Sequence, residues 1–384
     1  MALATVFTLQ QVYDKQLSGE WPTQIDTPVT PYALWSWGTN SYGQLSLGNT
    51  TDYSSPKQVG SLTTWSTIHS GYYHTLALKT DGTMWAWGKN DLGQLGDGTT
   101  TNRSSPIQIG ALTSWSKIAA GDSTSLAIRT NGTLWSWGKN GTGQLGLDNQ
   151  TDYSSPKQVG SLTTWSSVAT AGNHSMAIKT DGTLWTWGWG YHGQLGVGNT
   201  TNYSSPMQVG ALTNWSKISG GEANTIAIKT DGTLWAWGLN SSGQLGVGNT
   251  SSYSSPKQVG SLTNWSNISS GQYTSVAVKT DNTMWSWGKN NFARLGLNDA
   301  SDRSSPTQIG ALTTWATIDT GFYHTLAVKT DGTLWTWGSN FSGPLGLGDA
   351  GSYTHRSSPV QVGALTTWLN VSAGYKFSIA LKGA

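Results

Sequence analysis

Trp85-Ala86-Trp87-Gly88 is one of seven copies of the tetrapeptide Trp-x-Trp-Gly, and successive copies start 50 residues apart. Their first residues are Trp35, Trp85, Trp135, Trp185, Trp235, Trp285 and Trp335. Self-similarity with a period of about 20 to 50 residues is typical of solenoids, propellers and arrays. Because each repeat also contains short strand patterns separated by glycine-rich turns, we predict a β-propeller with one blade per repeat.

A single repeat predicts four strands. Residues 65–70 form a short strand pattern, and residues 74–79 then alternate apolar and polar side chains with the period of two of a half-packed strand. Asp81-Gly82 follows, which between alternating runs is a strong hairpin signal. Residues 83–88 are therefore a third strand. Pro106 opens a weaker run, which suits an outer edge strand because proline cannot donate to a central ladder.

The two ends of the chain predict how the ring closes. Residues 33–60 supply a third and a fourth strand without a preceding hairpin, and residues 378–382 supply a second strand with no third one after it. We expect these halves to form one blade, which removes exposed sheet edges. The expected fold is an all-β, seven-bladed propeller of four-stranded blades over residues 34–384. Residues 1–33 are a separate N-terminal extension.

Composition narrows the classes of function. Charged residues are 10% of the chain and the formal net charge is +2, so no basic field is present to hold a nucleic acid. Cysteine is absent, which excludes disulfides and thiolate sites. No apolar stretch is long enough to span a membrane, and the N-terminus lacks the pattern of an ordinary secretory signal. We expect no membrane insertion, and a virion or extracellular location.

Residues at fixed repeat positions favour structural roles. The 23 tryptophans lie mostly in Trp-x-Trp and Leu-Thr-x-Trp, and are expected to fill the core. Lys79 and its equivalents precede the hairpin turns beside Asp81 and its equivalents, which is typical of a solvated rim of alternating charge.

Catalytic and metal-binding patterns are missing from the sequence. His74, His174 and His324 occupy the same repeat position in different blades, so they are not expected to form a metal cluster. His192, with Tyr191 beside it, lacks nearby carboxylates. We predict no catalytic residues, no cofactor and no metal, and therefore a protein that is not an enzyme.

Two strings in the repeat carry a family resemblance. Residues 85–96 have the pattern Trp-x-Trp-Gly-x-Asn-x-x-Gly-Gln-Leu-Gly, and residues 71–82 the pattern Gly-x-x-His-Thr-x-Ala-Leu-x-x-Asp-Gly. Together they resemble the repeat of the regulator of chromosome condensation superfamily, over residues 34–382. The resemblance implies the seven-bladed fold. Members of the superfamily include a nucleotide exchange factor, a secreted β-lactamase inhibitor and ubiquitin-ligase modules, so it implies no single activity.

The N-terminal extension contains a short amphipathic pattern. Thr8 can cap a helix whose apolar face is formed by Leu9, Val12, Tyr13 and Leu17. Such a strip cannot bury itself alone. It either packs against its own propeller or anchors the chain to another subunit, including a second copy of the chain. Residues 8–22 are similar to N-termini of bacteriophage virion proteins, which favours an anchor.

Differences between the repeats predict where a partner binds. They concentrate between the first and second strands and between the third and fourth strands, two loop sets that should emerge on one face. Loops on a rigid scaffold are where recognition is placed, although unconstrained drift gives the same pattern. Aromatic residues in these loops fall in neighbouring blades, whereas the facing blades carry Asp122, Asn173, Glu222 and Asn224. The predicted binding residues are Tyr72, Tyr73, Tyr273, Phe292, Phe322, Tyr323, Phe341 and Tyr375. Phe377 is expected to fold inward instead.

Two functions are consistent with this sequence. The first is a non-enzymatic virion structural or adhesion protein, whose propeller contacts a host surface protein or neighbouring virion subunits. The second is a soluble protein- or carbohydrate-binding module, similar to an inhibitor or a lectin, that uses one propeller face on a protein or a surface glycan. Both predict a binding protein.

Overall fold

The computed structural model describes residues 32–383, in which all regular structure is β-strand except one short 3₁₀ turn, η1 (Asn291–Ala293). The expected anchor residues Leu9, Val12, Tyr13 and Leu17 lie outside the described residues. In the described part, no helix is long and apolar enough to cross a membrane.

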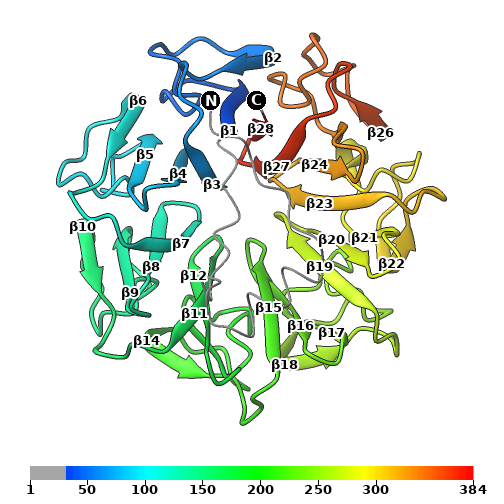
Figure 1. Cartoon of the computed structure of the whole chain (residues 1–384). Helices are drawn as coiled ribbons and strands as arrows, with labels where there is room; N and C mark the ends of the chain where they lie inside the picture. Colours follow the sequence, from blue (N-terminus) through cyan, green and yellow to red (C-terminus); the bar gives the residue numbers. More distant parts are fainter. Residues whose placement is uncertain (1–31, 384) are drawn as a thin grey trace, which may run out of the picture. The chain divides into compact units, whose positions relative to one another are not determined.

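Seven four-stranded antiparallel blades surround a central axis (Figure 1), and the single pair Tyr32↔Trp65 joins the closing blade and its neighbour into one eight-stranded sheet. The first strand of each blade lies nearest the axis. These strands are β3 (Trp65–Ser70), β7 (Trp115–Ala120), β11 (Trp165–Thr170), β15 (Trp215–Gly220), β19 (Trp265–Ser270), β23 (Trp315–Thr320) and β27 (Trp368–Ala373). The second strands are β4 (His74–Lys79), β8 (Thr124–Arg129), β12 (His174–Lys179), β16 (Asn224–Lys229), β20 (Thr274–Lys279), β24 (His324–Lys329) and β28 (Phe377–Gly383).

The third and fourth strands complete each blade towards the outside. The third strands are β1 (Tyr32–Gly38), β5 (Met84–Gly88), β9 (Leu134–Gly138), β13 (Leu184–Gly188), β17 (Leu234–Gly238), β21 (Met284–Gly288) and β25 (Leu334–Gly338). The fourth strands are β2 (Tyr53–Gln58), β6 (Arg103–Gln108), β10 (Tyr153–Gln158), β14 (Tyr203–Gln208), β18 (Tyr253–Gln258), β22 (Arg303–Gln308) and β26 (Arg356–Gln361). The prediction of an all-β fold with four-stranded blades is confirmed.

The fourth strand starts earlier than the sequence predicts. β6 begins at Arg103 rather than at Pro106, and the same shift occurs in the other blades. Ala86 pairs with Ile107 and Gly88 pairs with Arg103, so the ladder is irregular between these two pairs. Pro106 lies in this irregular stretch of an edge strand, where its missing N–H costs no central ladder hydrogen bond.

The glycine of Trp-x-Trp-Gly is required by close backbone packing. Gly88 has a φ of +99°, in the left-handed region that favours glycine. A Cβ atom at this position would lie 2.4 Å from the carbonyl oxygen of Tyr73. Only glycine therefore lets the third strand end against the loop between the first and second strands.

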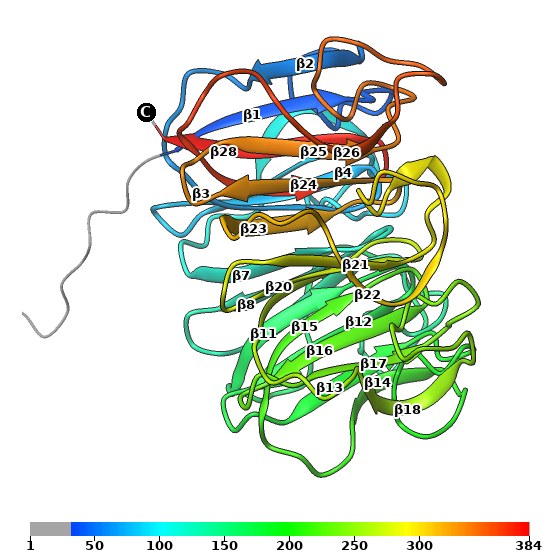
Figure 2. The same ribbon diagram turned by 90° about the vertical axis from the view of Figure 1, so that its right-hand side faces the viewer.

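The ring closes through strands from both ends of the chain, as predicted. β1 pairs antiparallel with β28 from Tyr32↔Gly383 to Gly38↔Phe377, and Figure 2 shows the two strands side by side. β28 also pairs with β27, and β1 pairs with β2, so this blade takes two strands from each terminus. Phe377 is fully buried, as expected.

Hydrogen bonds between blades reinforce the tryptophan core. The Trp137 indole N–H donates to the Gln94 carbonyl oxygen of the preceding blade at 2.9 Å. The Ser125 hydroxyl donates to the same oxygen at 2.7 Å, and the His74 Nε2 atom lies 2.9 Å from that hydroxyl. Because the Ser125 proton is already donated, the Nε2–H of His74 must be the donor in this contact. The repeat-position histidine therefore links neighbouring blades.

The lysines before the hairpin turns do not form the solvated rim that the sequence predicts. Lys229 is only 7% exposed, and its Nζ atom lies 3.6 Å from the Trp235 ring centroid and 5.0 Å from that of Trp215. Asp231 accepts hydrogen bonds from the N–H and hydroxyl of Thr233 instead of pairing with the lysine. The lysines therefore make cation–π contacts in the core. The same contact recurs at Lys79, Lys179, Lys279 and Lys329.

Candidate functional site

The two variable loop sets lie on one face of the propeller. Tyr42, between β1 and β2, contacts Tyr73, between β3 and β4, with ring centroids 5.1 Å apart. The Asp-Gly and Leu-Thr-x-Trp turns, whose sequence is nearly the same in every repeat, contact each other instead. The N–H of Trp115, which follows Leu-Thr-x, donates to the carbonyl oxygen of Gly82 in the Asp-Gly hairpin. This arrangement agrees with the predicted alternation of turns and gives one variable face.

Five predicted binding residues form a continuous aromatic cluster on this face. The cluster consists of Tyr72, Tyr73, Phe322, Tyr323 and Tyr375. Tyr72 stacks on Tyr375 at 4.3 Å and contacts Phe322 edge-to-face at 4.8 Å. All five side chains are half-buried. Burial and neighbouring phenols raise the pKa of Tyr73 and of Tyr323 to about 12, so both hydroxyls keep their protons at neutral pH.

Phe292 and Phe341 extend the aromatic cluster outward. The Phe292 ring lies 5.8 Å from Tyr323 and 5.2 Å from Phe341. His355 also joins, at 5.3 Å from Phe292. Phe292 and Ala293 have φ values of 61° and 58°, a left-handed conformation that is rare for side chains with a Cβ. Backbone strain of this kind is concentrated at functional sites.

A buried arginine supports the cluster from below. Arg294 stands where most repeats have glutamine, and it is 2% exposed. Its guanidinium donates to the Phe322 carbonyl oxygen at 3.1 Å and lies 4.9 Å from the Tyr323 ring centroid. Burial lowers the pKa of Arg294 to about 10, which leaves it charged at neutral pH. Tyr273 makes no aromatic contact within residues 32–383, and Lys289 Nζ lies 5.3 Å from its ring.

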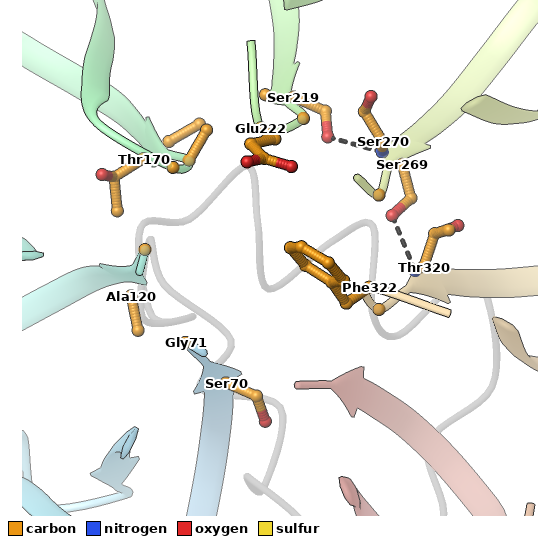
Figure 3. A pocket seen from close by; sticks show the side chains of 18 of the residues that line it. Ser70, Gly71, Ala120, Thr170, Ser219, Glu222, Ser269, Ser270, Thr320 and Phe322 are labelled. Carbon is orange, nitrogen blue, oxygen red and sulfur yellow. Dashed lines mark hydrogen bonds between the residues drawn. The ribbon is translucent and has the colours of Figure 1, made fainter. Parts of the chain in front are cut away.

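A cavity of about 450 Å³ lies where the first strands of all seven blades end (Figure 3). Asp122, Glu222 and Asp319 line it, and none of its described lining residues is lysine or arginine. One wall is aromatic and is formed by Tyr72, Phe322 and Tyr375. Burial raises the pKa of the Asp122 carboxyl, although Lys139 and Lys89 oppose the shift. The cavity therefore combines carboxylates with part of the aromatic cluster.

The polar residues of the facing blades, Asp122, Asn173, Glu222 and Asn224, are called the polar arc, and the histidines lie in several blades. Burial lowers the pKa of His74, His174 and His324 to about 3, so these side chains are neutral. Residues 32–383 contain no group of three or more histidine or acidic side chains arranged to hold a metal ion. Asn224 is buried and donates to the Ser270 hydroxyl at 3.1 Å. His192 contacts Trp189, away from the cluster.

Sequence reasoning missed three contributors to this face. His355 lies in residues 351–356, where the last repeat has three residues more than the others, and that insertion was its only signal in the sequence. Arg294 was signalled by its departure from the Gln-Leu-Gly pattern that four of the other repeats have. The cavity wall around Glu222 had no signal, because a single acidic residue in a variable loop does not indicate a cavity.

Structures of known proteins share this fold at low sequence identity. Prp20p from Saccharomyces cerevisiae, studied for its binding to Gsp1p and histones, is 23% identical, with a TM-score of 0.81 and 92% of each chain covered. Yeast RCC1 (Prp20) bound to Kap60 is also 23% identical, with a TM-score of 0.82 and coverage of 92% of this chain and 89% of that chain. Human WBSCR16 is 21% identical, with a TM-score of 0.81 and coverage of 92% and 99%.

Family comparison places every blade in one repeat type. No curated protein sequence matches the chain. The model of the regulator of chromosome condensation (RCC1) repeat matches seven segments, and a second model of the same repeat matches six shorter segments with other bounds, from 65–94 to 315–343. The seven segments are 33–78, 81–128, 131–178, 181–228, 231–278, 281–328 and 331–381. Because these segments cover most of the sequence, the chain belongs to the family of proteins built from regulator of chromosome condensation (RCC1) repeats.

Proposed function

We propose that this chain is a non-enzymatic binding protein that holds a protein partner against the aromatic cluster. The observation that carries the proposal is the continuity of the cluster: seven of the eight predicted residues form one network of ring contacts, from Tyr72 to Phe341. Half-buried aromatic side chains provide large contact area at low entropic cost, and binding hot spots are rich in tyrosine. Unconstrained drift would scatter such residues over all blades.

The geometry of the rings favours a protein over a glycan. Most contacts in the cluster are edge-to-face, such as Tyr72 on Phe322 with an interplanar angle of 77°. Rings packed this way cover one another's faces and present edges and hydroxyls, which suits a protein surface with hydrogen-bonding groups. A sugar-stacking site needs open ring faces. The parallel rings of Trp189 and Tyr191 are the alternative glycan site. Their interplanar angle is 6°, and Tyr191 is 67% exposed.

We place this activity on a virus particle or in the extracellular space, in a displayed adhesion or virion structural protein. The support is the similarity of residues 8–22 to phage virion N-termini, a segment outside the described residues. The runner-up is a soluble binding module without an anchor. Detection of the chain on purified particles favours the first setting, and a freely secreted chain favours the second.

A matched pair of variants tests the binding face. Replacing Tyr73, Phe322, Tyr323 and Tyr375 by serine should weaken partner binding by more than about 2 kcal/mol, roughly 30-fold. Serine already occupies the equivalent of Tyr73 in the next blade, at Ser123, so the backbone tolerates it. The control replaces exposed leucines of the Leu-Thr-x-Trp turns on the opposite face, Leu62, Leu112, Leu162 and Leu312, by serine.

The assay captures partners from host cell-surface extract or virion subunits on both variants and on the unaltered chain, then titrates the captured partner. Loss confined to the aromatic variant, with both variants still cooperatively folded, supports the proposal. Equal binding by the aromatic variant rejects the aromatic site. Stronger loss on changing Asp122 than on changing the four aromatic residues moves the site to the polar arc.

A further inference from the structure

The cavity on the propeller axis is negatively charged and lacks a balancing cation in its wall. Its three carboxylates come from Asp122, Glu222 and Asp319, and its nearest titratable base, His69, has a pKa lowered by burial. No lysine or arginine lines it within residues 32–383. A ligand with a positive charge is the chemical complement of such a site.

The three carboxylates differ in what they already bind. Asp319 accepts hydrogen bonds from the Ser269 hydroxyl at 2.9 Å and from the Ala373 N–H at 2.8 Å, so its role is structural. Asp122 has Lys139 and Lys89 as cationic neighbours. Glu222 forms no ion pair within the described chain, and its Oε2 atom is buried there without a hydrogen-bond partner. Glu222 is therefore the carboxylate with unused acceptor capacity.

The wall beside Glu222 offers further unused hydrogen-bonding groups. In four of the seven blades a loop N–H donates to the next blade, as Tyr72 does to Gly121 at 2.9 Å. Within residues 32–383 the loop N–H groups of Gly172, Glu222 and Gln272 make no such bond, so the Gly271 and Gly321 carbonyl oxygens accept none there. The Thr320 hydroxyl also has no partner in the described chain, but Figure 3 shows it directed away from the cavity, so it is not one of these groups. Buried polar groups without partners are costly, which indicates a ligand that supplies donors.

The opposite wall suits the rest of a cationic ligand. Figure 3 shows Glu222 and Phe322 both reaching into the cavity from different blades. Phe322 contacts Tyr72, and Tyr72 stacks on Tyr375, so the wall is a continuous aromatic surface. Aromatic faces attract cations, and methylene groups pack on them favourably. A carboxylate facing an aromatic wall is the arrangement that an alkylammonium group requires.

We propose that the axial cavity binds an alkylammonium group, with Glu222 as its counter-ion and Phe322, Tyr72 and Tyr375 around its methylene chain. The group comes from a small free amine or from a lysine side chain of the protein partner. This inference rests on the proposed function, because the cavity shares three residues with the aromatic cluster. Glu222 and the unpaired carbonyl oxygens accept the ammonium hydrogens.

Calorimetric titration of the full chain with 1,5-diaminopentane, measured without any protein partner, tests the cavity directly. Saturable binding is expected, and Glu222→Gln should weaken it at least about tenfold because the amide removes the charge that the ammonium pairs with. Asp148→Asn is the matched control, since Asp148 is exposed in the variable loop between β9 and β10 and does not line the cavity. Its affinity should stay within about twofold of the unaltered chain.

Two further arms separate the sources of the amine and isolate its charge. A lysine-containing peptide and its Nε-acetyl form are titrated beside the diamine. If the unacetylated peptide binds more tightly than both its acetyl form and the diamine, the source is a partner lysine. If the diamine binds more tightly than the unacetylated peptide, the source is a free amine. Unchanged affinity in Glu222→Gln, equal binding of 1-hexanol and hexylamine, or no saturable binding of any amine overturns the inference. Because no protein partner is present, such failure leaves the serine-variant test of the aromatic cluster unaffected.

Discussion

Acidification should unfold this protein through three buried histidines. The Nε2–H of His74 donates to Ser125, whose own proton goes to Gln94, while the Nδ1 atom has no partner within the described chain. A proton added at Nδ1 would therefore be buried without an acceptor. His174 and His324 make equivalent contacts, with Thr225 and Ser378. Burial lowers the pKa of each from 6.5 to about 3.

The sign and size of the effect follow from proton linkage. Between pH 6.5 and pH 3 the unfolded chain holds more protons on these histidines than the folded chain does, so stability is complete above pH 6.5 and falls as the pH drops. Each histidine costs about 2 kcal/mol between pH 7 and pH 5, and the three together about 6 kcal/mol. That sum is comparable to the whole stability of many domains, about 5 to 15 kcal/mol.

The measurement is the free energy of unfolding from urea titrations at pH 7 and pH 5, for the unaltered chain and a variant with threonine at positions 74, 174 and 324. Threonine is the native residue at this repeat position in Thr124 and Thr274, so each blade can accept it. The variant should have a much smaller difference between the two pH values. His69, whose pKa burial also lowers, remains and leaves a residual slope. Thr274→Ser, at the same repeat position but without a titratable group, is the control and should retain the full slope. Equal slopes in the triple variant and the unaltered chain would refute the reasoning.

Two other predictions concern the scaffold. Deleting residues 377–384 removes β28, which pairs with both β1 and β27, so calorimetry should show the loss of cooperative unfolding or aggregation; a melt like that of the full chain would contradict closure by two strands from each end. Lys229→Met should destabilise the protein by about 1 kcal/mol through the lost cation–π contact, whereas Lys117→Met, at an exposed position of β7, should be nearly neutral in the same urea titration. An equal loss of unfolding free energy in the two lysine variants would show that the contact of Lys229 with the Trp235 ring adds no stability.

The fold could be predicted from the sequence because its signals are local and repeated. The alternation in His74–Lys79 and the Asp81-Gly82 turn define one hairpin, and the period copies it around the ring. The start of β6 could not be predicted, because Pro106 lies in an irregular part of the ladder and is no longer a boundary. The interpretation of the lysines failed because it considered only neighbours along the chain. Trp215 pairs with Lys229 across two strands, and that register places the ammonium over the rings.

Part of the binding face was predictable because the repeats serve as internal controls. Positions that are free to vary carry Tyr72 in one blade and Gly172 in another, and this difference identifies a face without any other sequence. The same comparison could not place Tyr273, whose neighbours in space are Lys289 and Arg294 instead of other rings. It also could not show that Glu222 lacks a partner, since this depends on the hydrogen bonds of adjacent blades.

The aromatic cluster lies across the seam where the ring closes, and this links the scaffold to the proposed function. Phe322 follows β23, Tyr375 follows β27 and Tyr72 follows β3, so the central residue of the three belongs to the blade built from both chain ends. The Tyr375 N–H donates to the Tyr72 carbonyl oxygen across this seam. These rings meet only after β28 pairs with β1. Truncation of β28 therefore removes the binding face together with the fold, and only side-chain substitutions can separate the two roles.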